Sequence, residues 1–185
     1  MLHGGWGSWS HWIRTIPALT AERTVYAADL PGMGASANMP KPHTAERLAL
    51  VVAKGLERLL PAMEPYHAVC FSFGGIIGSW VAACHGLRCK SLTLTGAAGF
   101  GDLHIVVEGI KIPDLSLNDV DTDNVHRENL RLLMFSDIHS IDSLAVYIHR
   151  QNIARGWIRT RHISLSEGLL NILPMVESPF GCIWW

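Results

Sequence analysis

The sequence predicts an α/β fold in which a mostly parallel sheet carries helices on both faces and a helical cap is inserted. Over the first hundred residues, short apolar segments of strand character alternate with segments of helical spacing. From residue 102 to 173 the strand signals disappear and only helical patterns remain. A strand signal then returns, so we expect a core at 1–101, a helical cap at 102–173 and a return to the core at 174–185.

The composition is that of a globular protein and argues against two classes of partner. The 185 residues are 49% hydrophobic and 17% charged, which is ample for a buried core. The 15 Lys and Arg residues against 16 Asp and Glu residues give a formal net charge of -1. Nucleic acids and anionic membranes attract proteins with a positive excess, so neither is expected as a partner.

The cysteines and the N-terminal residues predict a cytoplasmic protein. No signal peptide is visible ahead of the glycine-rich stretch that starts at His3. No CxxC pair suggests zinc or redox chemistry, so the cysteines are predicted to be small buried residues in a reducing compartment. They are Cys70, Cys84, Cys89 and Cys182.

The elements of the core follow from apolar periodicity. The predicted strands are 24–28, 67–71, 91–95 and 180–184. The predicted helices are 9–19, 45–60 behind a Thr44 cap, and 74–84 before Gly86. The uncharged stretch 68–87 is long enough to span a membrane, but its serines and glycines favour a buried strand, a tight turn and a buried helix.

Within the cap, helices are expected over 141–148 behind a Ser140 cap and over 165–173 before Pro174. The acidic run 119–123 fails the calcium-loop pattern at its sixth and twelfth positions and is predicted to be a solvated loop. A basic stretch either is a solvated face or holds a substrate carboxylate. It contains His149, Arg150, Arg155, Arg159, Arg161 and His162.

The candidate for chemistry is Ser72, at the junction of a predicted strand and a predicted helix and two residues before Gly74. A sharp turn there presents the hydroxyl at the C-terminal edge of the sheet. The following amide, that of Phe73, starts the helix and can point at an oxyanion. A flexible loop, His3-Gly4-Gly5-Trp6-Gly7, can offer a second amide, that of Gly5. By itself an S-x-G triplet is also typical of an ordinary strand-to-helix turn.

Together with the turn Asp29-Leu30-Pro31-Gly32-Met33-Gly34-Ala35-Ser36, these segments resemble the α/β-hydrolase superfamily. Its members carry an HG loop, a D-x-P-G-x-G-x-S turn and an x-x-S-x-G-G nucleophile elbow in this order. The resemblance implies a serine hydrolase with Ser72 as nucleophile, the amides of Gly5 and Phe73 as oxyanion hole, a small-molecule substrate, and neither cofactor nor metal. It also implies that Asp29 orders the glycine turn.

The sequence departs from the family pattern at several places. Cys70 replaces the first glycine of the usual G-x-S-x-G. The family places the triad acid and histidine beyond the strand that starts at Phe180, and neither is present at its expected place. Only Met1 and Leu2 precede the HG loop, where the family builds about three strands. The chain therefore resembles an internal fragment with a hole in its sheet, and we expect it to be poorly stable.

The expected reaction is hydrolysis of a small organic ester, thioester or activated carbon–carbon bond through a serine acyl-enzyme. The cap resembles that of hydrolases of aromatic ring-cleavage products, although those carry asparagine where Phe71 stands. The alternative is a non-catalytic remnant or interaction domain. The ten histidines are expected in surface or capping roles, and the sequence alone places none of them beside Ser72. We expect Ser72 to have a strained backbone, the Phe73 amide to lack an intrachain partner, and the cap to cover the C-terminal edge of the sheet.

Overall fold

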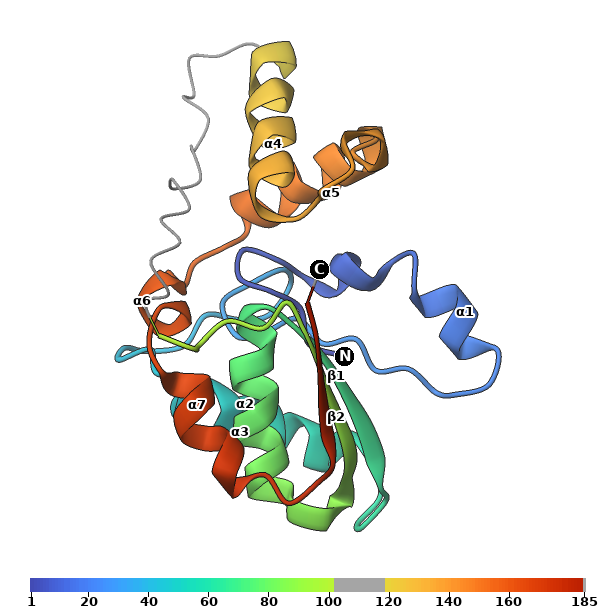
Figure 1. Cartoon of the computed structure of the whole chain (residues 1–185), viewed down its shortest axis with the longest axis vertical. Coiled ribbons are helices and arrows are strands. Elements are labelled where there is room, and N and C mark those ends of the chain that lie inside the picture. Colours follow the sequence, from blue (N-terminus) through green and yellow to red (C-terminus); the bar gives the residue numbers. More distant parts are fainter. Residues whose placement is uncertain (102–118, 185) are drawn as a thin grey trace. The chain divides into compact units, whose positions relative to one another are not determined.

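The computed structural model describes residues 1–101 and 119–184 and divides into two compact units (Figure 1). The first unit comprises Met1–Leu103 and Arg155–Trp185 and contains the sheet. The second comprises His104–Ala154 and is helical where it is described. Each unit has its own set of packed apolar side chains.

The first unit is built on a parallel sheet of three strands in the order β1-β2-β3. The strands are β1 (Tyr66–Phe71), β2 (Cys89–Thr95) and β3 (Phe180–Ile183). At the C-terminal edge of this sheet Phe71 pairs with Thr95, and Thr95 pairs with Ile183. The prediction of a parallel sheet is confirmed, and these three strands start within two residues of their predicted positions.

Leu2 occupies a place beside β1, where the sequence predicts a hole in the sheet. It forms parallel bridges with Ala28 on one side and Cys70 on the other. The Leu2 amide donates to the Val69 carbonyl at 2.9 Å, and the Phe71 amide donates to the Leu2 carbonyl at 3.0 Å. The hole is therefore absent at the level of Cys70.

The predicted strand 24–28 is reduced to a single bridge at Ala28. The physical reason is the shortness of its partner, because only Met1 and Leu2 lie beside it. The Ala28 amide donates to the Met1 carbonyl at 3.2 Å, and the N-terminal ammonium donates to the Tyr26 carbonyl at 2.6 Å. A strand is defined by its pairing, and one paired position does not make a ladder.

Helix α3 (Phe73–His85) packs on β1 and β2 and contacts α2 (Ala45–Leu59) and α7 (Gly168–Ile172) (Figure 1). The predicted Thr44 cap is confirmed, because its hydroxyl accepts from the Arg47 amide at 3.3 Å. The shorter elements of this unit are η1 (Trp9–Trp12), α1 (Ile16–Thr20), η2 (Gly86–Arg88), α6 (Arg161–Ser164) and η4 (Leu173–Met175).

Helix α3 approaches the sheet closely because two of its glycines face other groups at short distance. A β-carbon added at Gly78 would lie 2.3 Å from Cys70 Sγ, and one added at Gly74 would lie 2.5 Å from the His3 carbonyl oxygen. The thiol that stands where the family usually has glycine is therefore accommodated by a glycine on the opposing helix. Cys70 is completely buried as a result.

Two of the four cysteines depart from the prediction of burial. Cys70 and Cys89 are buried, whereas Cys84 and Cys182 are exposed, and all four are free thiols. Cys182 lies on β3, whose four residues are all exposed. Cys84 lies in the last turn of α3, beyond the part of that helix that is buried most completely.

The second unit contains α4 (Asp119–Leu133), η3 (Ile138–Ser140) and α5 (Ser143–Ala154). The acidic run 119–123 is the first part of α4, so its prediction as a loop is wrong. Carboxylates near a helix N-terminus are stabilised by the helix dipole, which explains why these residues can be helical. The predicted Ser140 cap is also wrong, because the Asp142 carboxylate caps α5 by accepting from the Ala145 amide at 2.9 Å.

The described helical unit is narrower than the predicted cap of 102–173. Residues 102–118 of that cap lie outside the described residues, and α6 and α7 belong to the first unit. That this helical segment covers the C-terminal edge of the sheet stays a prediction. Within the described residues, no helix combines the length and the apolar character that crossing a membrane requires.

Candidate functional site

Ser72 connects the end of β1 to the start of α3, as predicted, and its backbone is in a conformation that non-glycine residues rarely adopt. Its φ is 51° and its ψ is -120°. Three backbone hydrogen bonds hold it there: Ser72 N donates to the Thr95 carbonyl at 3.0 Å, and the Ser72 carbonyl accepts from the Gly75 amide at 2.9 Å and the Ala98 amide at 3.2 Å. Strained residues persist where the surroundings over-determine them, which is common at functional sites.

The Ser72 hydroxyl and the Phe73 amide at this turn have no hydrogen-bond partners within the described part of the chain. The Ser72 hydroxyl forms no hydrogen bond with another described residue. The Phe73 amide likewise donates to no described acceptor, which matches the prediction for this group. Phe73 is the first residue of α3, and the first amides of a helix have no acceptor within the helix.

The glycine loop at the N-terminus lies directly on this turn. A β-carbon added at Gly4 would lie 3.2 Å from Ser72 Cβ and 3.0 Å from two atoms of the Phe71 ring. One added at Gly5 would lie 3.7 Å from Phe73 Cβ. The Gly5 amide also has no acceptor among the described residues. The structure thus brings Ser72, Gly5 and Phe73 together as the sequence predicts.

His3 fixes the peptide group that carries the Gly5 amide. The ring is completely buried, with Nδ1 2.7 Å from the Gly4 carbonyl and Nε2 2.9 Å from the Leu30 amide. These partners assign the tautomer, because the ring must donate through Nδ1 and accept through Nε2. In a trans peptide the carbonyl and the next amide point in opposite directions. The bond to the Gly4 carbonyl therefore orients the Gly5 amide away from His3.

Burial makes His3 a neutral residue. It lowers the pKa of His3 to about 4, against smaller opposing effects of the Gly4 hydrogen bond and the Asp29 carboxylate. A protonated ring would also lose the acceptor that the Leu30 amide uses. The prediction of a surface or capping role is wrong for this histidine, and the small residues that follow it are the signal of its close packing.

Asp29 joins the glycine turn to the HG loop, as its implied structural role requires. One carboxylate oxygen accepts from the Trp9 amide at 2.6 Å, and the other accepts from the Ala35 amide at 2.8 Å. Its own carbonyl accepts from the Ser36 hydroxyl at 2.7 Å. Both oxygens thus accept from backbone amides, which agrees with the structural role that the resemblance implies for Asp29.

The described part of the chain does not supply Ser72 with a base. The His11 ring lies against the Phe71 ring with centroids 5.8 Å apart, and no hydrogen bond joins Ser72 to any described histidine. His104 lies outside the described residues. No group of three metal-ligating side chains was found among the residues with described positions.

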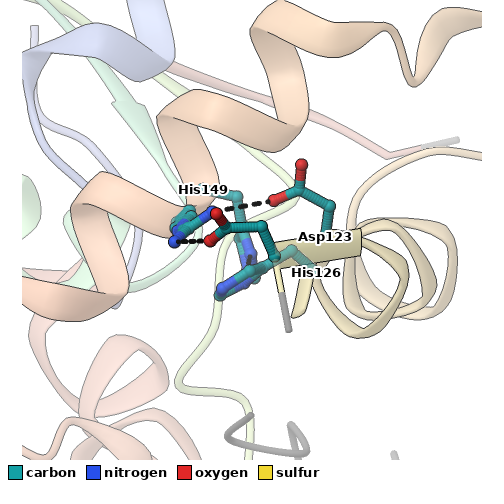
Figure 2. Close-up of polar contacts among 5 residues, drawn as sticks. Asp123, His126 and His149 are labelled. Atoms are coloured by element: carbon teal, nitrogen blue, oxygen red, sulfur yellow. Dashed lines mark hydrogen bonds and ion pairs between the residues drawn. The ribbon is translucent and has the colours of Figure 1, made fainter. Parts of the chain in front are cut away.

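A second cluster of titratable side chains lies between α4 and α5 (Figure 2). His126 and His149 are both buried, and their Nδ1 atoms are 2.9 Å apart. Arg150 binds Asp119 at 2.7 Å and Asp123 at 3.3 Å. Arg150 belongs to the basic stretch that could hold a substrate carboxylate. In the structure its guanidinium already binds two carboxylates of its own unit.

The prediction of a surface or capping role is wrong for His126 and His149, because histidine is usually at least partly exposed and its residue type does not indicate burial. The detectable signal is positional: Val146, His149 and Asn152 share the buried face of α5, and His126 lies on α4 with buried Leu130 four residues later. One ring must donate and the other accept, so at least one must be neutral. Burial, and secondly the charge of His126, lowers the pKa of His149 to about 4.

We expect acid to loosen this helical unit. A histidine whose folded pKa is below its unfolded value of 6.5 stabilises the fold fully above pH 6.5, and that stability is lost as the pH falls towards 4. The loss is on the order of 1 to 3 kcal/mol. Hydrogen exchange of the α4 and α5 amides between pH 7 and 4 measures it. The double variant His126→Leu/His149→Leu should flatten this dependence, whereas His139→Ala, an exposed control, should not. An unchanged acid slope in the double variant would contradict the assignment.

The sequence profile of the Alpha/beta hydrolase family matches residues 1–169 of this chain. Among curated proteins, the chain is 36% identical over 102 residues to the dihydrolipoyllysine-residue acetyltransferase component of an acetoin cleaving system from Pseudomonas putida, covering 55% of this chain and 27% of that protein. It is 34% identical over 93 residues to a pimeloyl-[acyl-carrier protein] methyl ester esterase from Aeromonas hydrophila, covering 50% of this chain and 34% of that protein. The matched part thus spans about a quarter to a third of these relatives.

Solved structures show the same fold over the whole chain. An N-acyl homoserine lactonase, AidH, complexed with N-butanoyl homoserine aligns with a TM-score of 0.69 and 18% identity, covering 100% of this chain and 68% of that one. A meta-cleavage product hydrolase from Pseudomonas fluorescens aligns with a TM-score of 0.64 and 20% identity, covering 99% and 70%. At this identity the likeness is one of fold. Because the family profile covers most of its length, the chain belongs to the alpha/beta hydrolase family.

Proposed function

We propose that this protein hydrolyses a small organic ester, thioester or activated carbon–carbon bond through an acyl-enzyme on Ser72. The observation that carries the proposal is the backbone of Ser72, held at φ 51° by three hydrogen bonds while its hydroxyl has no partner among the described residues. Such a turn holds the nucleophile in place and leaves its oxygen available for attack.

The two amides beside Ser72 support a role in charge stabilisation. When Ser72 Oγ attacks a carbonyl carbon, the carbonyl oxygen becomes negative and needs donors at once. The amides of Gly5 and Phe73 have no described acceptor. The two residues belong to different segments but lie close together, because a β-carbon added at Gly5 would lie 3.7 Å from Phe73 Cβ. We assign them as the oxyanion hole, with His3 positioning the first.

The similar proteins support acyl chemistry as the reaction class. One is a methyl ester esterase, one an N-acyl homoserine lactonase and one a meta-cleavage product hydrolase. They differ in substrate, and Phe71 stands directly before the nucleophile in this chain. We therefore propose a small acyl substrate without specifying it further, and a reaction that needs no cofactor. The four free thiols are in keeping with a cytoplasmic protein.

A non-catalytic role is the second candidate, and one observation favours it. The Ser72 hydroxyl has no hydrogen bond to a described histidine, so nothing described here removes its proton. A protein that keeps the fold as an interaction domain would need no such base. The two candidates differ in whether Ser72 is a nucleophile at all, which can be tested directly.

A fluorophosphonate probe tests the proposal. Ser72 Oγ would form a bond to phosphorus, the phosphorus–fluorine bond would break, fluoride would leave and the hydroxyl proton would pass to solvent. We expect slow labelling of one serine over hours to days, with intact mass and peptide mapping placing it on Ser72, and loss of the label in Ser72→Ala. Ser91→Ala is the matched control, because the Ser91 hydroxyl already lies 2.7 Å from a His67 ring nitrogen. Labelling that persists in Ser72→Ala, or no labelling of Ser72, would overturn the proposal.

A further inference from the structure

A hydroxyl beside the oxyanion loop, that of Thr160, has no hydrogen-bond partner among the described residues. Thr160 is only 3% exposed and stands at the N-cap position of α6. An N-cap threonine normally accepts from an amide of its helix, yet this side chain forms no capping bond. It forms no hydrogen bond with any other described residue either. The hydroxyl is therefore available to an acceptor that comes from outside the chain.

The fold fixes the position of this hydroxyl. The Thr160 carbonyl accepts from the Ile163 amide at 3.0 Å and the Ser164 amide at 2.9 Å. Ahead of it, the Trp157 amide donates to the Gly32 carbonyl at 2.8 Å. Ile158 is buried against the same turn, because a β-carbon added at Gly32 would lie 2.5 Å from Ile158 Cγ1. The segment that carries Thr160 is thus held on both sides.

The hydroxyl flanks both residues that we assign to the oxyanion hole. A β-carbon added at Gly5 would lie 2.6 Å from Thr160 Oγ1 and 3.7 Å from Phe73 Cβ. The absence of a side chain at Gly5 therefore allows the hydroxyl to come this close. Thr160, Gly5 and Phe73 belong to the same compact unit but to three segments distant in sequence.

We propose that Thr160 is a catalytic residue, whose hydroxyl donates a third hydrogen bond to the substrate oxygen held by the Gly5 and Phe73 amides. This inference rests on the proposed function of Ser72. A donor that is already in place, and that gains strength as negative charge develops, lowers the barrier without reorganisation. The hydroxyl can rotate about its C–O bond, so its hydrogen can be directed at the substrate once the oxygen arrives.

Two variants separate the hydroxyl from the shape of the side chain. Thr160→Val keeps the size and branching but removes the donor, whereas Thr160→Ser keeps the donor but removes the methyl group. The rate constant for phosphonylation of Ser72 by a fluorophosphonate reports on the oxyanion site, because the phosphoryl oxygen occupies it. We expect Thr160→Val to lower this rate constant by about 10- to 100-fold and Thr160→Ser to change it by less than about threefold.

Control variants distinguish failure of the Thr160 proposal from failure of the proposal that Ser72 is the nucleophile. Thr24→Val, at an exposed threonine, should label at the parental rate, and melting temperatures should show that all variants are folded. If Ser72→Ala abolishes labelling but Thr160→Val labels at the parental rate, Thr160 is not a donor while Ser72 remains the nucleophile. If Thr160→Ser lowers the phosphonylation rate constant as much as Thr160→Val does, the methyl group and not the hydroxyl is responsible, and the proposal is overturned. If Ser72 is not labelled in the parent chain, both proposals fail.

Discussion

Ser72→Ala should lower ester turnover by about 10⁴- to 10⁶-fold in a form of this protein that carries a triad acid and histidine. In the proposed mechanism the alanine removes the oxygen that forms the acyl-enzyme, while substrate binding and the two oxyanion amides remain. A form that carries the acid and histidine of the family pattern should hydrolyse p-nitrophenyl esters. The rate of nitrophenolate release measures the effect.

The chain of 185 residues should itself show little or no turnover, because no described histidine is hydrogen-bonded to Ser72 and a serine hydroxyl without a base is a weak nucleophile. Ser91→Ala in the form that carries the acid and histidine is the control and should keep the parental rate. Rapid turnover that survives Ser72→Ala would place the chemistry elsewhere. Rapid turnover of the 185-residue chain that Ser72→Ala abolishes would mean that a histidine within it completes the site.

The central part of the fold could be predicted because local and tertiary signals agree there. Between Tyr66 and His85 a largely apolar strand, a serine turn and an apolar helix follow one another, and each is recognisable from the sequence pattern. The predicted burial of the strand is confirmed at Cys70, whereas His67 is exposed. The glycines that follow Ser72 have a tertiary cause, since Gly74 faces the His3 carbonyl and Gly78 faces Cys70. Close packing of a helix against its neighbours can therefore be recognised in the sequence by glycines at the contact positions.

The arrangement of the site could be predicted in outline for the same reason. Loops at the carboxyl ends of neighbouring parallel strands converge, so the order of the motifs places Gly5, Ser72 and Phe73 together. The pattern does not identify Thr160, which approaches Gly5 from a segment about 150 residues later. A lone threonine before Arg161 is typical of a helix cap, and only the unused hydroxyl shows otherwise.

The errors come from pairings that no local pattern encodes. Strand character at 24–28 is genuine in composition, but its neighbour offers one bridging residue, Leu2. The run starting at Asp119 is loop-like in composition, yet the dipole of α4 and the ion pairs to Arg150 stabilise it as helix. His126 and His149 are polar residues, and they can be buried because their rings form a hydrogen bond with each other. That bond depends on the packing of α4 against α5, which the sequence pattern does not specify.

Substitution of His3 should lower both the stability of the first unit and the reactivity of Ser72. His3→Phe keeps an aromatic ring in the buried site but removes both ring nitrogens, and so leaves the Gly4 carbonyl and the Leu30 amide without their partners. Each unsatisfied buried polar group costs about 1 to 3 kcal/mol, so two of them should lower the free energy of unfolding by roughly 2 to 6 kcal/mol. Denaturant titration of the chain measures this.

The reactivity of Ser72 should fall as well, because the Gly4 carbonyl sets the direction of the Gly5 amide. Losing one oxyanion donor lowers rates by about 10²- to 10³-fold, and we expect phosphonylation in His3→Phe to slow towards that range at temperatures where the variant is folded. His67→Phe is the matched control, since that ring is exposed on β1 and its loss should change the free energy of unfolding by less than about 1 kcal/mol.

Acidification of the unsubstituted chain should cause part of the loss of stability that His3→Phe causes at neutral pH. The pKa of His3 is lowered to about 4 by burial, so its contribution to stability is complete above the unfolded value of 6.5 and is lost as the pH falls towards 4. In that range the rising population of protonated rings can no longer accept from the Leu30 amide. The first unit of His3→Phe should therefore lose less stability between pH 6.5 and 4 than the first unit of the parent. Equal losses in both, or a His3→Phe variant as stable as the parent at pH 7, would show that the two ring hydrogen bonds do not fix the loop.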